Sequence, residues 1–447
     1  MVGPLLTALF YLALRYYNVP HEAAVVAAVT LLCSVWWTLE TLPIFVTSLL
    51  PVALFPLLGV MAPTDVAGAV GHPLILLLLG GFILSKSMEC SGAHRRGALW
   101  VVRLVGTRSS KRLVFGFMAA SAAMSLWISN TATTLMLLPV ALAAVERSKD
   151  PRLTKALVLG LGYSASVGGI GTPVGTPPNV LFMSAYEEIT GTALGFTDWM
   201  TWGVPVVVVA VPAMAWWLTR NLSGAGAEVP ALGPISAHER RVLLVFGLTA
   251  LAWVTRTHPN GGWKTLLQLP NANDASVALL ACVALFAIPN GRGGRLLNWN
   301  TANEIPWGVL LLFAGGLTIA KAFGVTGLSK MLGQHLTVVA LLPPLLLVLL
   351  LTLVVSFLTE VTSNTATTAL LLPILGATAL SSGVEASLLM VPATMAASCA
   401  FMLPVATAPN AVIYSSGYVT VRDMVRQGFV LNLLVTLIVA GVCFALL

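Results

Sequence analysis

Charged residues are scarce in this 447-residue sequence: Asp, Glu, Lys and Arg together make up 9% of it, against roughly 25% of an ordinary soluble domain. Hydrophobic residues make up 57%. The charges cluster between uncharged stretches of about 20 residues, the length that an α-helix needs to cross a hydrocarbon core. This scarcity excludes a soluble enzyme, and the stretches predict an all-α polytopic membrane protein.

The sequence also lacks a cysteine framework. Its five cysteines are odd in number, show no CxxC spacing and lie in or beside apolar runs, so we expect neither disulfides nor a metal site among them. The net charge of +7 lies in short segments between apolar spans rather than on one face. Such charges are topology signals, and they indicate no nucleic-acid partner.

Hydropathy and basic residues together predict the topology of the chain. The segment 93–112 follows four apolar spans and carries six basic residues and no acid, which places it in the cytoplasm, and its apolar residues suit an amphipathic surface helix. The N-terminus is then inside, and Arg422 and Arg426 start the last span inside, so the C-terminus is outside. These features predict a multi-pass protein of the cytoplasmic (inner) membrane. The first four spans are expected at 2–18, 22–39, 42–61 and 72–91.

Two segments predict re-entrant hairpins. Residues 113–146 carry no charge before Glu146 and are flanked by basic clusters at both ends. Two full crossings need about 40 residues and a turn, so a hairpin that enters and leaves from one side fits better, with its midpoint at Ser129, Asn130 and Thr131. Residues 337–381 hold one ionisable side chain, Glu360, and predict a second hairpin that enters from outside.

The two halves of the chain repeat each other. The hexapeptide SNTATT occurs at 129–134 and again at 363–368, GTPPN at 175–179 matches ATAPN at 406–410, and Gly80-Gly81 matches Gly315-Gly316. These markers recur in order at a nearly constant offset. Because the predicted hairpins enter from opposite sides, we expect an inverted-topology repeat, an arrangement that is typical of transporters.

The repeated polar residues predict a binding site at the middle of the membrane. Hydropathy places Asn130 and Asn364 there, where an unsatisfied amide costs several kcal/mol. One interpretation is that they join helices by hydrogen bonds. A duplicated Ser-Asn-Thr at a hairpin tip instead favours interrupted helices, as do the Gly- and Pro-rich segments 168–179 and 403–410. Helix N-termini at these interruptions can hold an anion.

The same segments favour coupling to a cation. No Lys or Arg lies within 113–146, 156–219 or 336–421, so a bound anion needs helix dipoles, amides, hydroxyls and co-bound cations to offset its charge. Ser125 precedes Ser129 by four residues, and Thr359 precedes Ser363 by four. Each pair is expected on one helical face, where its hydroxyls suit a hard cation. Glu360 is either a functional carboxylate or a structural group near the tip.

These motifs resemble those of the divalent anion/sodium symporter family. The resemblance extends from about residue 40 to the C-terminus, through LWISNTATT, GGIGTPVGTPPN, SFLTEVTSNTATT and FMLPVATAPNAVIYSSG. It implies a homodimer of about eleven transmembrane helices and two re-entrant hairpins per protomer, with a transport domain that moves against a fixed scaffold like an elevator. The implied parts are 1–112 (scaffold and surface helix), 113–220 (transport domain, first half), 221–242 (cytoplasmic linker), 243–336 (scaffold, second half) and 337–447 (transport domain, second half).

The resemblance also implies two sodium sites with a substrate site between them. The sodium ligands would come from Ser125, Ser129, Asn130 and Gly175 in the first half and from Thr359, Ser363, Asn364 and Ala406 in the second. The substrate carboxylates would be held by Asn130, Thr131, Asn364 and Thr365, with Thr176 and Thr407 closing the pocket. One departure concerns the second half, where Ala408 replaces the proline found at Pro177, so the second interruption depends on Pro409 alone.

We therefore expect sodium-coupled symport of C4-dicarboxylates such as succinate, malate and fumarate, with Na⁺ as the co-transported ion and no organic cofactor. The alternatives are a sodium-independent dicarboxylate exchanger, or citrate or sulfate as the main substrate. An intramembrane enzyme with Ser129 or Ser363 as nucleophile is not expected, because neither hairpin core holds a His or Lys to act as a base.

Overall fold

The computed structural model describes residues 2–39, 41–146, 150–227, 229–230, 232–257, 261–329, 331 and 342–447. In these residues the regular secondary structure is helical, and β-type pairing is limited to two isolated β-bridges. Six of the helices are long and apolar enough to cross a membrane. The prediction of an all-α polytopic membrane protein is confirmed at this level. The six spans are His21–Leu39, Pro63–Ser91, Phe196–Thr219, Trp307–Val325, Asn364–Ser382 and Val421–Leu446.

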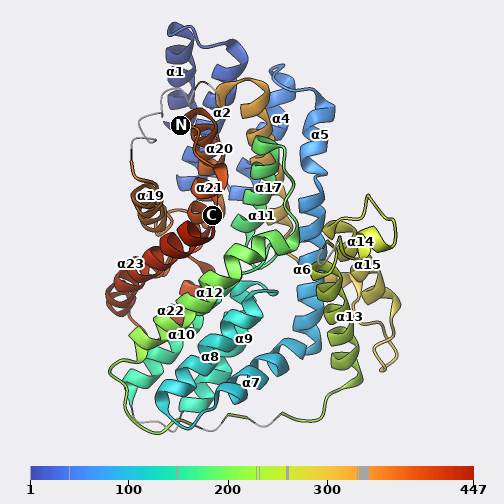
Figure 1. Ribbon diagram of the computed structural model, residues 1–447, viewed down its shortest axis with the longest axis vertical. Helices are drawn as coiled ribbons and strands as arrows, with labels where there is room; N and C mark the ends of the chain where they lie inside the picture. The colour runs from blue at the N-terminus through green and yellow to red at the C-terminus, as the bar shows by residue number, and fades with distance from the viewer. Residues whose placement is uncertain are drawn as a thin grey trace.

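The described residues of the first half form the helices α1 to α12, which run from blue to green in Figure 1. The six that precede the basic segment are α1 (Val2–Tyr16), α2 (His21–Leu39), α3 (Ile44–Thr47), α4 (Leu49–Leu57), α5 (Pro63–Val70) and α6 (Pro73–Ser91). The six that follow are α7 (Ala93–Val105), α8 (Ser110–Ser125), α9 (Asn130–Val145), α10 (Pro151–Gly169), α11 (Pro177–Thr190) and α12 (Phe196–Thr219).

The described helices of the second half run from yellow-green to red in Figure 1. Those before the gap in the described residues are α13 (Ala237–Val254), α14 (Gly262–Leu266), α15 (Asp274–Ala287), α16 (Trp299–Ala302) and α17 (Trp307–Val325). Those after it are α19 (Pro344–Leu358), α20 (Asn364–Ser382), α21 (Ala386–Ala397), α22 (Ala408–Ser415) and α23 (Val421–Leu446). The predicted start of the second hairpin at 337 lies outside the described residues.

Three predicted boundaries differ from the structure. The span expected at 42–61 is divided into α3 and α4, because Pro51 has no N–H to donate to the carbonyl of Thr47; that carbonyl accepts a weak bond from Cys33 Sγ at 3.9 Å instead. The surface helix expected over 93–112 ends at Val105. The linker expected at 221–242 already becomes helical at Ala237, where Ser236 and Glu239 form a capping box.

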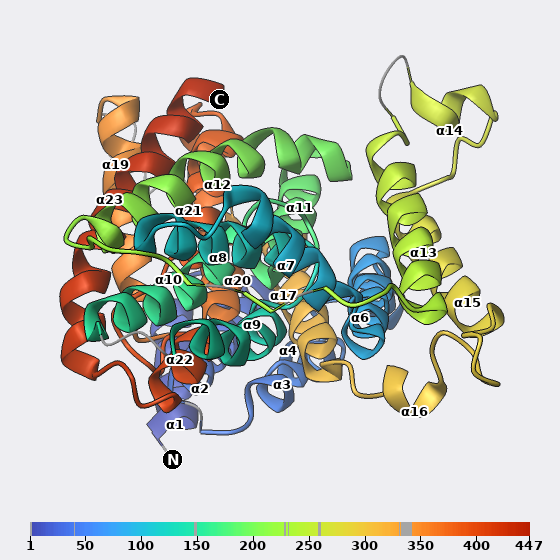
Figure 2. The ribbon, with the colours of Figure 1, turned by 90° about the horizontal axis from the view of Figure 1, so that it is seen from below.

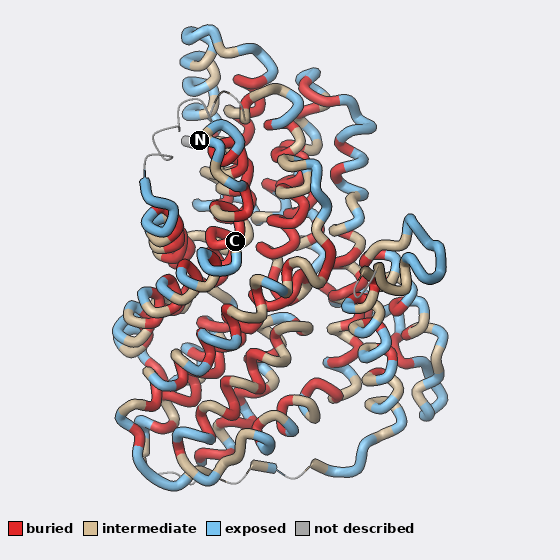
Figure 3. The backbone as a smooth tube through the Cα atoms, in the orientation of Figure 1, coloured by how far each residue is buried: buried red, intermediate tan, exposed pale blue. Residues whose placement is uncertain are grey.

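The two halves interlock rather than lying side by side. Helix α22 of the second half packs on α9 and α10 of the first, and α11 of the first half packs on α20 and α21 of the second. Seen from below, α13 to α16 lie to one side of this bundle, with α13 and α15 packed on α6 (Figure 2). Buried residues follow the facing sides of the helices, and exposed residues their outer sides (Figure 3).

Candidate functional site

The first Ser-Asn-Thr segment interrupts the chain between α8 and α9, as predicted. Helix α8 ends at Ser125, and α9 begins at Asn130 with Ser129 as its extended N-cap residue at φ −47° and ψ 133°. The expectation that Ser125 and Ser129 share one helical face is wrong, because the helix ends between them. Asn130 instead turns back toward Ser125, and their side chains lie 2.5 Å apart.

The second Ser-Asn-Thr segment has the same geometry. Helix α19 ends at Leu358, and α20 begins at Asn364 with Ser363 as its extended N-cap residue. Thr359 follows the last residue of α19, so the shared helical face expected for Thr359 and Ser363 is also wrong. The Thr359 hydroxyl donates to Asn364 Oδ1 at 2.7 Å, and this contact matches that of Ser125 with Asn130.

Two further helices are interrupted at the predicted Gly- and Pro-rich segments. Residues 170–176 separate α10 from α11, and residues 398–407 separate α21 from α22. In the first, the fully buried Asn179 donates to the carbonyls of Gly169 at 2.9 Å and Thr172 at 2.7 Å. In the second, the fully buried Asn410 donates to the carbonyls of Ala400 at 3.1 Å and Leu403 at 2.9 Å.

The last residue of each repeated five-residue motif therefore holds its own interruption in shape. Each amide thus satisfies backbone carbonyls that the interrupted helix has released. The second interruption forms although Ala408 replaces a proline, because Thr407 caps α22 by accepting from the N–H of Asn410 at 3.2 Å.

Glu360 is a structural group at the second tip. It is 1% exposed, and its carboxylate accepts from the backbone N–H groups of Phe401 at 2.6 Å, Met402 at 2.9 Å and Leu403 at 3.0 Å. The amide of Asn432 on α23 donates to it as well, at 2.8 Å. Of the two interpretations left open by the sequence, these four bonds favour the satisfied structural carboxylate, because they occupy both of its oxygens.

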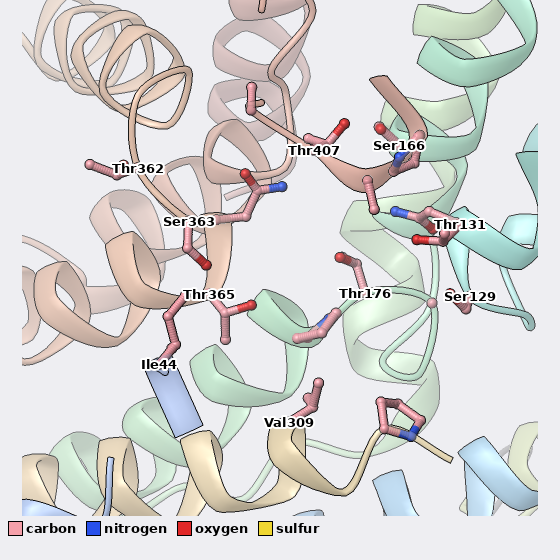
Figure 4. A pocket seen from close by; sticks show the side chains of 18 of the residues that line it. Ile44, Ser129, Thr131, Ser166, Thr176, Val309, Thr362, Ser363, Thr365 and Thr407 are labelled. Atoms are coloured by element: carbon pink, nitrogen blue, oxygen red, sulfur yellow. The ribbon is translucent and has the colours of Figure 1, made fainter. Parts of the chain in front are cut away.

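The two tips and the two interruptions line a single cavity of about 710 Å³. Figure 4 shows Ser129 and Thr131 on one side of it, Ser363 and Thr365 on the other, and Thr176 and Thr407 between them. Among the described residues that line it, none is Lys, Arg or His. Ten predicted site residues line the cavity: Ser129, Asn130, Thr131, Gly175, Thr176, Ser363, Asn364, Thr365, Ala406 and Thr407.

The other two predicted site residues, Ser125 and Thr359, are fully buried behind the cavity wall. They reach the site through the amides of Asn130 and Asn364. The Thr359 hydroxyl also lies 2.8 Å from the carbonyl oxygen of Ala397, the last residue of α21, so that its one proton is shared between this carbonyl and Asn364. Each hydroxyl thus contacts the asparagine of its own Ser-Asn-Thr segment and does not face the cavity.

The surroundings of Asn130 suit a hard cation. When the amide nitrogen points inward, it donates to Ser125 Oγ at 2.5 Å and to the carbonyls of Ala165 at 3.2 Å and Gly175 at 3.3 Å. With the amide reversed, Oδ1 joins the same three oxygens and completes the all-oxygen surroundings that such ions prefer. A Cβ on Gly175 would lie 2.5 Å from the carbonyl oxygen of Gly169, so only glycine permits this approach.

One wall of the cavity was missed from the sequence. It is made by side chains of helices that lie outside the two tips and the interruptions, and Figure 4 shows Ile44 and Val309 among them. Apolar residues in spans give no sign of whether they face lipid, protein or a cavity, so only the repeated Gly80-Gly81 marker pointed there. The wall includes Trp37, Ile44, Gly81, Phe82, Ser85 and Val309.

Comparisons with known proteins place the chain among transporters. A family model described as citrate transporter matches residues 34–390. The sodium-dependent dicarboxylate transporter SdcS of Staphylococcus saprophyticus is 37% identical over 100% of this chain and 90% of its own length. SdcS of Staphylococcus aureus (strain MW2) is also 37% identical, over 99% of this chain and 90% of its own length.

Two solved structures share the fold. The Alcanivorax borkumensis YdaH transporter aligns with a TM-score of 0.62 at 15% identity, over 95% of this chain and 98% of that one. Neisseria gonorrhoeae MtrF, described as illuminating a class of antimetabolite efflux pumps, aligns with a TM-score of 0.61 at 16% identity, over 87% and 83%. At these identities the likeness concerns the fold alone.

Proposed function

The chain belongs to the citrate transporter family and, with the sodium-dependent dicarboxylate transporters, to the divalent anion/sodium symporter family; from this premise we propose that it carries C4-dicarboxylates such as succinate, malate and fumarate together with Na⁺. The single observation that carries the proposal is the pair of Ser-Asn-Thr tips that face each other across a cavity with no cationic side chain among its described lining residues. A dianion in such a cavity needs co-bound cations to offset its charge.

The substrate site lies between the two tips in this proposal. Asn130 and Thr131 hold one carboxylate, Asn364 and Thr365 hold the other, and Thr176 and Thr407 border the substrate between them. The N-termini of α9 and α20 begin at the two asparagines, so their unpaired N–H groups and partial positive charge add to the attraction.

The two sodium ions lie behind the substrate, one in each half. The first is held by Ser125, Ser129, Asn130 and the carbonyl of Gly175. The support for it is the oxygen cluster around the Asn130 amide. The second ion is held by Thr359, Ser363, Asn364 and the carbonyl of Ala406. Each asparagine therefore contributes to an ion site and to the substrate site. Binding of Na⁺ orders the side chain that the substrate needs, and this couples ion binding to substrate binding.

Transport proceeds by an elevator movement of a transport domain (113–220 and 337–447) against a scaffold (1–112 and 243–336), joined by the linker 221–242. The cavity supports this division, because both Ser-Asn-Thr tips come from the first group and the mostly apolar wall with Ile44 and Val309 comes from the second. The protein acts as a homodimer in the cytoplasmic membrane, with its N-terminus inside and its C-terminus outside.

Uptake of radiolabelled succinate into proteoliposomes tests the proposal. With an inward gradient of Na⁺, empty vesicles should accumulate succinate above equilibrium, whereas K⁺ or choline should not support this. Uptake that ignores Na⁺ and requires preloaded succinate would make the protein an exchanger and remove the sodium sites. Unlabelled citrate and sulfate are added as competitors, because the matching family model is named for citrate; stronger competition by either than by succinate would change the main substrate.

A further inference from the structure

A second polar cavity lies far from the Ser-Asn-Thr tips, where the first turns of α10 and α23 meet the end of α12. Its volume is about 160 Å³, which is enough for a phosphate group but not for a dicarboxylate with its ions. We call it the basic pocket, and it is lined by Arg152, Lys155, Arg220, Asn221, Asp423 and Gln427.

The basic pocket carries uncompensated positive charge. Its carboxylate, Asp423, is already engaged by Lys155 at 2.8 Å and by the backbone and hydroxyl of Thr420. Arg152 and Arg220 line the basic pocket, and the exposed Arg426 adds a like charge that acts on Arg220. Neither Arg220 nor Arg426 forms an ion pair within the described part of the chain. Since Asp423 is already paired with Lys155, the remaining cationic side chains favour an added anion.

The Arg220 side chain is held in position for such an anion. Its guanidinium lies 3.5 Å above the ring of Trp217, and one of its nitrogens donates to the carbonyl of Trp217. Trp217 is fixed in turn by its own bond to Gln427 Oε1 at 3.1 Å. The remaining N–H groups of Arg220 have no partner in the part of the chain that the structure describes, and a planar guanidinium can offer two parallel bonds to a phosphate.

Next to the basic pocket, the outer faces of α12 and α23 are apolar and exposed. Trp216 is 67% exposed, Phe429 47% and Val425 40%, and α12 packs against α23. In a chain that spans a membrane, such faces contact acyl chains, and Trp is enriched where the chains meet the headgroups. The basic pocket and the apolar face therefore lie next to each other, as the phosphate and the acyl chains of a phospholipid do.

We propose that the basic pocket binds the phosphate of one anionic membrane phospholipid, whose acyl chains lie against Trp216, Val425 and Phe429. Arg220, which lines the basic pocket with Arg152, binds the phosphate directly, and Arg152 and Arg426 add positive charge around it. The first turns of α10 and α23 contribute their partial positive charge. Basic pockets between transmembrane helices are recognised sites for anionic headgroups.

Native mass spectrometry of the full-length protein in detergent tests this proposal. We expect phosphatidylglycerol to bind in preference to phosphatidylcholine. The double variant Arg220→Gln/Arg426→Gln should bind phosphatidylglycerol about thirtyfold more weakly, at the strength typical of two basic side chains near a headgroup. The matched control is Arg108→Gln/Arg112→Gln, which removes the same charge from two exposed arginines elsewhere and should bind like wild type.

The single variant Arg426→Gln keeps the test decisive if loss of Arg220 prevents folding. Arg426 is exposed and makes no described bond through its side chain, so we expect a folded protein with about fivefold weaker binding. Equal binding of the two lipids, or an equal loss in the control, would overturn the proposal. Displacement of phosphatidylglycerol by millimolar inorganic phosphate would assign the basic pocket to a soluble anion instead.

Discussion

The interruption at 170–176 and the interruption at 398–407 have the same outline but different supports. In both, a buried asparagine donates to released carbonyls, Asn179 in the first and Asn410 in the second. The first is further held by a neutral donor, since Trp199 Nε1 donates to the carbonyl of Ile170 at 2.7 Å. The second is held by the charged acceptor Glu360.

This difference separates two kinds of residue in a duplicated protein. The two Ser-Asn-Thr segments, which face the cavity, are identical in both halves. Residues that support the interruptions are not identical: by the offset between the two segments, Glu360, which borders the cavity but bonds to backbone N–H groups, corresponds to Leu126. Residues of this second kind can differ wherever each half satisfies its backbone in its own way.

The largest expected effect belongs to the residues that are the same in both halves. Asn130→Ala and Asn364→Ala should each reduce succinate uptake about a hundredfold, because each removes an amide from a charged ligand and from an ion site at once. Both variants should remain folded by size-exclusion chromatography. Near-normal uptake by one folded variant would show that the halves do not share the substrate equally and would sink the site assignment.

Glu360 should produce the second-largest effect, on stability. In Glu360→Ala the N–H groups of Phe401, Met402 and Leu403 lose their acceptor, so the free energy of unfolding should fall by about 3 kcal/mol or more. A thermal unfolding curve in detergent measures this. Glu360→Gln is the matched control, because it keeps one acceptor oxygen at the same length and should lose less. If Glu360→Ala melts like wild type, the carboxylate does not support the interruption.

Features that repeat in both halves were predicted from the sequence, and features that occur in one half only were not. The tips and the interruptions were predicted from SNTATT and the two proline motifs, because a duplicated polar pattern inside apolar spans has few structural explanations. The ten cavity-lining residues were named through the family resemblance that these motifs carry. The role of Glu360 could not be predicted, since its partners are backbone N–H groups about forty residues away, which carry no sequence signature. The shared helical face of Ser125 and Ser129 failed because spacing alone does not reveal where a helix ends.

A smaller effect should distinguish the two hydroxyls behind the cavity. Ser125→Ala and Thr359→Val should each raise the Na⁺ concentration for half-maximal uptake about fivefold to tenfold, the strength of one hydrogen bond or ligand contact of this kind. Thr359→Val should also lower the melting temperature, because Thr359 bonds to Ala397 as well as Asn364. Thr359→Ser keeps the hydroxyl and should restore both properties. An unchanged Na⁺ dependence in both variants would remove these residues from the ion sites.

The smallest effect should come from the hydroxyl that supports the first interruption. Thr172 is fully buried and donates to the carbonyl of Leu126, so Thr172→Val removes one neutral bond at nearly constant volume and should cost about 1 kcal/mol of stability. Uptake and Na⁺ dependence should stay near wild type. Because Leu126 corresponds to Glu360, this variant measures the first half's support directly against the second. A loss of stability as large as that of Glu360→Ala would mean that the neutral hydrogen bond and the charged carboxylate contribute equally to the free energy of unfolding, although they differ chemically.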